Sequence, residues 1–345
     1  MKYLLQARDI FARWQISQTR EPGPSGALDL FCDEAFFAGA MAYWEALLSF
    51  VFDQPLDALD YLDQPAMRAA EAQKAHPWTG NGTQMFLNLA KVGIMARQRR
   101  VISRLDHLNL NPAIQKSIVD SLLGRAVTLE TALLQNIASD GVTDKTTLDS
   151  DLGRFTTSYK LAGLLELYRH FPELLDEQGG LDTARRTVSR TGPFTTGDDQ
   201  ANAHNLANKT CADIAMTILS LLEEVKTTGA ISIAQTLALL IAGSSLRKPE
   251  SALPKIPRRT LMEELEAVQG RHSVIERWRT FVRQRVSSNT HQSGLISISM
   301  VEPLLEEVWR REDARQQGDS TQTLSTPPTH WLTVMAEMKL ETLYG

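Results

Sequence analysis

The side chains that could do chemistry are few and widely spaced in this sequence. None of the seven histidines has another histidine or a cysteine three or four residues away, so no pair is spaced to hold a metal ion from one helix face. The two cysteines, Cys32 and Cys211, lie far apart, which gives neither a zinc-binding CxxC pair nor a disulfide framework. We therefore predict no metal site and no cofactor, with both cysteines and the histidines His76 and His170 serving packing or capping roles.

The motifs of the common enzymes are also missing. The sequence contains no HExxH zinc helix, no GxxxxGK[ST] phosphate loop and no GxSxG nucleophile elbow. Gly80-Asn81-Gly82 is half of a dinucleotide-binding GxGxxG, and no predicted strand precedes it. The one adjacent aspartate pair, Asp198-Asp199, lies in a predicted loop rather than on a helix that could bind a diphosphate through magnesium. We predict that the protein is not an enzyme and keep an unrecognised helical enzyme as a remote alternative.

Charge and hydropathy narrow the function classes further. The chain has 345 residues, with 36 lysines and arginines against 41 aspartates and glutamates, a formal net charge of -5. This balance argues against a surface that holds nucleic acid by neutralising phosphates. Residues 29–63 carry eight carboxylates and no cation, while residues 271–285 carry five arginines and one glutamate. We interpret both as solvated helix faces, with a partner or nucleic-acid surface as the alternative. The longest membrane-like run, residues 46–52, is too short to span a bilayer, so we predict a soluble protein.

The elements that would position any site are helices. Apolar residues recur with helical spacing, and no strand–helix alternation or hairpin signal appears. We predict an all-α fold, a single large helical globule over residues 1–345 with no significant sheet. A flexible loop is predicted at 176–205 and a linker at 313–328, and residues 295–300 are the one alternative strand. About ten helices are expected, at residues 4–14, 30–52, 55–62, 83–105, 111–136, 149–170, 206–225, 232–241, 258–286, 300–312 and 330–343. In the first helix, Leu4, Ile10, Phe11 and Trp14 are predicted to share one face. The helix at 232–241 is apolar almost all round and is therefore predicted to be buried.

Three stretches of the sequence resemble a known family. Residues 43–55, YWEALLSFVFDQP, are similar to a signature of the fungal-specific transcription factor domain. HPWTG at 76–80, KVG at 91–93 and RQRR at 97–100 follow in the family's order, and residues 304–311 and 331–335 resemble its closing helices. The signature residues, which we interpret as structural, are Tyr43, Trp44, Glu45, Asp53, Gln54, Pro55, Pro77, Trp78, Thr79, Gly80, Lys91 and Gly93.

The resemblance implies a regulatory region of a fungal zinc binuclear cluster transcription factor. Such a region would act in the nucleus, control transcription by RNA polymerase II, and respond to an effector or to co-regulator proteins. A hydrophobic small-molecule effector is implied by relatives that sense such ligands in a helical pocket. Trp44, Trp78, Phe86 and Met95 are the candidate lining residues, with plain core packing as the alternative for each.

The resemblance also sets limits on what this sequence is expected to do. The family's DNA-binding module needs six closely spaced cysteines around two zinc ions, and only two distant cysteines are present, so we expect no zinc cluster and no direct DNA contact. A homodimer is compatible with the resemblance, and contact with a membrane is not expected. The alternative function is a stand-alone helical protein, cytoplasmic or nuclear, that lost the zinc cluster and binds ligands or partners.

Overall fold

The structure, a computed structural model, consists mainly of helices in the part of the chain that it describes. It describes residues 2–20, 27–71, 76, 79–80, 82–105, 112–139, 147–175, 197–226, 230–248, 258–317 and 329–340. Within these residues 88% of the chain is helical, and the only β feature is an isolated antiparallel bridge between His76 and Gly80. The predicted all-α class is therefore confirmed.

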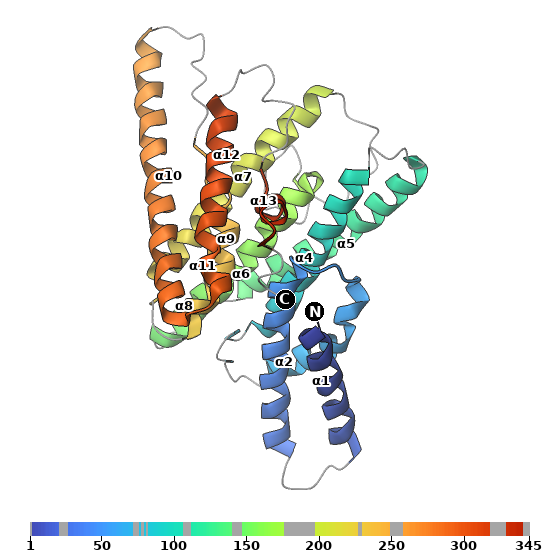
Figure 1. The fold of residues 1–345 in the computed structure, drawn as a ribbon. Helices are drawn as coiled ribbons and strands as arrows, with labels where there is room; N and C mark the ends of the chain where they lie inside the picture. Colours follow the sequence, from blue (N-terminus) through green and yellow to red (C-terminus); the bar gives the residue numbers. More distant parts are fainter. Residues whose placement is uncertain are drawn as a thin grey trace.

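The N-terminal part is an antiparallel pair of helices, α1 (Lys2–Arg20) and α2 (Ala27–Ser49), drawn in blue in Figure 1. The short helices η1 (Leu56–Leu62) and α3 (Asp63–Glu71) follow it. Pro55 precedes η1 with an extended backbone, as expected for a residue whose ring cannot continue a helix. Leu4 and Phe11 of α1 are buried, but Ile10, which we predicted on the same face, is 67% exposed. The prediction was wrong because six residues turn a helix by about 600°, which places Ile10 about 120° away from Leu4.

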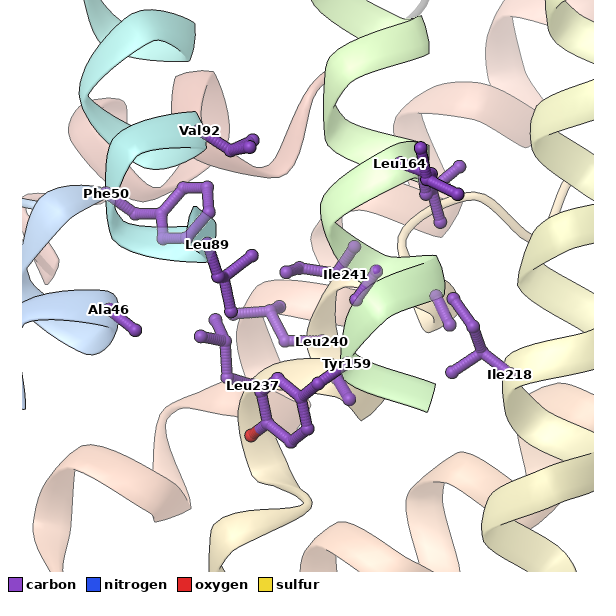
Figure 2. Close-up of a cluster of buried hydrophobic side chains, with 14 of the residues drawn as sticks. Ala46, Phe50, Leu89, Val92, Tyr159, Leu164, Ile218, Leu237, Leu240 and Ile241 are labelled. Carbon is purple, nitrogen blue, oxygen red and sulfur yellow. The ribbon is translucent and has the colours of Figure 1, made fainter. Parts of the chain in front are cut away.

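The central part brings together α4 (Thr83–Leu105), α5 (Pro112–Ser139), α6 (Thr147–His170) and α7 (Gly197–Glu224), with the short helix η3 (Pro172–Leu174) after α6. Figure 2 shows the core where these helices meet α2 and the later helix α9 (Thr236–Gly243). The side chains labelled there come from five helices or their ends and are Ala46, Phe50, Leu89, Val92, Tyr159, Leu164, Ile218, Leu237, Leu240 and Ile241. Every residue from Leu237 to Gly243 is buried, as the continuous apolar sequence of this segment predicted.

The C-terminal part comprises α8 (Ala230–Ala234), α10 (Arg258–Ser293), α11 (Ile296–Ser299), α12 (Val301–Gln317) and α13 (Trp331–Glu337). Helices α10 and α12 lie side by side in Figure 1 and are joined by an ion pair between Arg283 and Glu306. Leu237, Val282 and Trp331, from α9, α10 and α13, belong to one cluster of buried apolar side chains with Leu4 of α1.

Three segments differ from the sequence predictions. Residues 197–205 of the predicted loop, which include Asp198 and Asp199, form the first turns of α7, and residues 176–196 lie outside the described part. Residues 313–317 of the predicted linker continue α12, and residues 318–328 lie outside the described part. The alternative strand at 295–300 was wrong, because residues 296–299 form α11.

The arginine-rich stretch of α10 is only in part the solvated face that we predicted, since Arg277 is exposed but two other arginines are buried. Arg279 is buried and donates two hydrogen bonds of 2.8 Å to Asp313 of α12. Arg285 is also buried and donates to the backbone carbonyls of Leu222 at 3.0 Å and Val225 at 3.1 Å. These carbonyls end α7 without intrahelical partners, so Arg285 satisfies a helix terminus that burial would otherwise leave unpaired.

Helices α2 and α4 approach each other closely at Gly93. A Cβ atom added to Gly93 would lie 2.1 Å from the Ser49 hydroxyl oxygen and 2.9 Å from the Ser49 Cβ. The hydroxyl of Ser49 is buried and donates to the carbonyl of Ala46 at 2.9 Å. Glycine is therefore required here by the distance between the two helices.

We predict that Gly93→Ala lowers the free energy of unfolding by about 1–3 kcal/mol, because α2 and α4 must separate to admit the methyl group. The matched control is Gly124→Ala in α5, where an added Cβ would meet no atom within 4 Å. That change should raise stability by about 0.5–1 kcal/mol through helix propensity. Urea denaturation of both variants measures the difference, and equal effects would contradict the close approach.

Candidate functional site

An apolar cavity of about 280 Å³ lies between α2, the α8–α9 segment, the α11–α12 segment and α13. Its lining comes from sequence segments that are far apart and that the fold brings together. The lining residues are Tyr43, Trp44, Leu47, Val51, Ile233, Ala234, Thr236, Leu237, Leu240, Leu295, Ser297, Ile298, Val301, Trp331 and Met335.

The chemistry of this lining suits a neutral, apolar occupant. No charged side chain is among the lining residues. The hydroxyl of Thr236 carries no charge and donates to the carbonyl of Ile233 at 2.7 Å. Burial raises the pKa of Tyr43 to about 12, so its phenol stays uncharged near neutral pH. Pockets of this kind, with mostly apolar walls and few polar groups, are typical small-molecule sites.

The structure places the predicted lining residues in different environments. Trp44 lines the cavity and is 47% exposed. Phe86 and Met95 are fully buried in the core and are not among the lining residues, while Trp78 lies outside the described part.

Sequence reasoning missed most of the wall. Ile233, Leu237 and Leu240 recur at i, i+4 and i+7, a signal that marked an apolar helix face but not that a cavity lies against it. Leu295 and Trp331 gave no such signal at all.

The first signature stretch builds a buried ion pair. Glu45 is fully buried, and the guanidinium of Arg8 in α1 donates to both its oxygens at 2.6 Å. The hydroxyl of Tyr61 donates to the same carboxylate at 2.7 Å, and the side chain of Gln54 accepts from Arg8 at 2.5 Å. Burial raises the pKa of Tyr61, which keeps this hydroxyl a donor. Glu45 is therefore the point at which α1 is attached to α2.

Other signature residues also make structural contacts. Asp53 pairs with Arg97 at 2.8 Å, and Lys91 pairs with Asp63 at 2.7 Å, so both acidic residues are bound to α4. Asp53 and Asp63 remain 77% and 43% exposed in these pairs, so buried Glu45 is the exception to our interpretation of the acidic stretch 29–63 as a solvated face. The backbone N–H of Thr79 donates to His76 Nδ1 at 3.2 Å.

Gly80 has a φ of 56°, in the left-handed region that favours glycine. Pro77 lies outside the described residues.

A second buried polar cluster lies directly behind the cavity. The carboxylate of Glu166 in α6 is fully buried and accepts the indole N–H of Trp331 at 2.9 Å and the His330 Nε2–H at 3.1 Å. Arg169 lies 3.4 Å from the same carboxylate and donates to the Ser244 hydroxyl at 2.8 Å. Trp331 therefore belongs to both the cavity wall and this cluster, which we call the Glu166 network.

The Glu166 network contains the ligand types of a metal site. Glu166, His170 and His330 bring three potential ligand atoms within 4.8 Å of one another, a grouping that their spacing in the sequence did not indicate. Nδ1 of His330 accepts the Leu332 N–H at 3.1 Å, so Nε2 carries the proton that it shares with Glu166. With Arg169 beside the carboxylate, the arrangement is that of an ion pair surrounded by neutral histidines.

Burial keeps the two histidines neutral. It lowers the pKa of His170 to about 3, and a contribution of the same sign comes from His330. It also lowers the pKa of His330, with Arg169, Arg100 and Arg247 adding to the effect. Burial likewise raises the pKa of the Cys211 thiol to about 11, which suits the packing role predicted for it.

The comparisons with known proteins give one match. A family model described as the fungal specific transcription factor domain matches residues 1–345. No curated protein and no solved structure matches the chain. Among the described residues, no helix is long and apolar enough to cross a membrane.

We predict that Arg8→Met lowers the free energy of unfolding by about 3 kcal/mol, because it leaves the carboxylate of Glu45 buried without its cation. Adding Glu45→Gln to this variant should recover part of the loss, since a neutral amide costs less to bury. Arg13→Met removes the cation of the exposed Arg13–Asp9 pair of the same helix and should change stability by less than about 0.5 kcal/mol. Chemical denaturation would contradict the assignment if the two arginine variants lost the same stability.

We also predict a loss of stability in acid that comes from His170. Its pKa is about 3 in the folded protein and about 6.5 when unfolded, so between these values the unfolded chain binds a proton that the folded protein does not. Stability is thus full above about pH 6.5 and falls as the pH is lowered, by up to about 1.4 kcal/mol per pH unit. His170→Phe should flatten this slope between pH 6 and 5, and His291→Phe, which replaces an exposed histidine, should not. Urea titrations at each pH provide the slopes, and identical slopes in wild type and His170→Phe would refute the assignment.

Proposed function

Because the chain belongs to the fungal specific transcription factor domain family, we propose that it is the regulatory region of a transcription regulator and binds a hydrophobic small-molecule effector in the apolar cavity. In this proposal the protein acts in the nucleus, and effector binding controls its contacts with co-regulators. The observation that carries the effector site is the cavity between α2, α9, α11 and α13, with its lining free of charged side chains.

The size and walls of the cavity support this assignment. At about 280 Å³ it is close to the lower end of the 300–1,000 Å³ that small-molecule sites occupy. The aromatic rings of Trp44 and Trp331 and the branched side chains of Leu237 and Leu240 offer dispersion contacts to an apolar ligand. A carboxylate or a phosphate would enter without a cation to pair with, so the walls favour neutral ligands over fatty acids or nucleotides.

The contacts around the cavity also explain how an effector could act on the whole region. The lining comes from the first and last thirds of the chain, so an occupant contacts helices that are far apart in the sequence. A ligand that binds only the folded protein stabilises it by about 2.7 kcal/mol at 100 times its dissociation constant. Such a ligand changes the population of a partner-binding conformation to the extent that it binds that conformation more tightly than the alternative one.

We predict that Leu237→Trp weakens the binding of a neutral apolar probe, Nile red, at least tenfold. The larger indole would occupy the space beside Trp44 and Trp331, leaving too little room for the probe. Fluorescence titration of the purified protein gives the dissociation constants, and native mass spectrometry of the same preparations shows whether an apolar ligand is retained from the expression host.

The control is Ile118→Trp, which adds the same ring to an exposed position of α5 outside the cavity lining. It should bind Nile red as the wild type does. Equal affinity of both variants, or wild-type protein that neither binds the probe nor retains a ligand, would count against an effector site here.

A further inference from the structure

We propose that α13 couples occupancy of the cavity to the Glu166 network, so that a ligand in the cavity changes how firmly this helix is held. The inference rests on the proposed function, because it concerns how binding at that site is transmitted. Trp331 carries it, since its side chain lines the cavity while its indole N–H donates to Glu166 at 2.9 Å.

The N-terminal end of α13 is held by buried acidic groups of two other helices. His330 caps the helix by accepting the Leu332 N–H at Nδ1, and its Nε2–H donates to Glu166 of α6. The backbone N–H of Thr329 donates to Glu312 of α12, which is buried as well. Any displacement of Trp331 therefore disturbs hydrogen bonds that water does not replace, at a cost of about 1–3 kcal/mol for each buried group left unpaired.

The rest of α13 is attached by polar contacts on its outer side. The hydroxyl of Thr333 accepts a hydrogen bond of 2.9 Å from Arg100 of α4, and Glu337 pairs with Arg311 of α12. The helix has seven residues, too few to be stable alone in water. Its position is thus set entirely by these contacts and by what its inner side packs against.

The inner side of α13 is where an occupant would act. Trp331 and Met335 lie one turn apart and both line the cavity. Side chains that face an unfilled space lack part of their dispersion contacts, and a ligand in the cavity would supply them. Because the same helix makes both sets of contacts, firmer packing on the cavity side must strengthen its hold on Glu166, and the reverse follows by thermodynamic linkage.

The test measures this linkage in both directions on the full chain. Saturating Nile red should slow amide hydrogen exchange of α13 about five- to tenfold, within the usual range of coupling between two sites. Glu166→Gln keeps an acceptor for Trp331 but loses the ion pair with Arg169, and it should weaken Nile red binding by a similar factor. The matched control is Glu130→Gln, which changes a buried carboxylate that accepts from Tyr168 at 2.8 Å and does not line the cavity. Its Nile red affinity should stay within twofold of the wild type.

A second variant tests the coupling without any probe. Leu237→Trp fills the cavity from α9 and leaves Trp331, Glu166 and His330 unchanged, so it should slow exchange of the α13 amides in the unliganded protein. If wild-type protein does not bind Nile red, the proposed effector site loses support. The amide exchange rates of α13 in Leu237→Trp still test the coupling in that case. The coupling is overturned if α13 exchanges at the wild-type rate in Leu237→Trp, or if Glu166→Gln and Glu130→Gln bind the probe equally well.

Discussion

The need to satisfy the buried carboxylate of Glu166 constrains much of the C-terminal half of the structure. A fully desolvated charge is tolerated only when donors surround it, and here they come from Trp331, His330 and Arg169. Two of these donors belong to the end of the chain and one to α6, so the network fixes where the last helix lies. The orientation of Trp331, and with it one wall of the cavity, follows from this requirement.

Buried carboxylates also join helices at other places in the structure. Glu45 binds Arg8 and so joins α1 to α2, and Glu312 of α12 accepts from the backbone of Thr329 just before α13. Apolar packing alone is only weakly directional, and helices with apolar surfaces all round can slide against one another. A buried ion pair generally adds little net stability, because desolvation offsets the attraction between the charges. It nevertheless penalises every arrangement in which its two partners do not meet. These carboxylates therefore select one arrangement among several that would bury similar apolar area.

How much the sequence could predict depends on whether the signal is local. Helical periodicity predicted the all-α class, and the apolar stretch at 232–241 predicted a buried helix, because both are properties of consecutive residues. Arg279 and Arg285 looked like a solvated face because their partners, Asp313 and the end of α7, are distant in sequence. The cavity was beyond such reasoning for the same reason, and the core positions of Phe86 and Met95 cannot be told from lining positions by spacing. Trp44, a residue of the family signature, lines the cavity, but only the fold brings it to Trp331.

The cavity itself has an energetic consequence that bears on regulation. An enclosed apolar void costs about 24 cal/mol per Å³, so a space of about 280 Å³ would cost up to about 7 kcal/mol, comparable with the whole stability of a typical domain. The cavity opens toward Trp44, which is half exposed, so part of this cost is relieved by contact with solvent. A ligand that fills the space recovers part of this free-energy cost. The recovered free energy stabilises the helices that line the cavity, α13 among them, and not a helix that packs only in the core. The space lies beside a helix held by polar contacts, so one displacement of α13 reaches α4, α6 and α12 together.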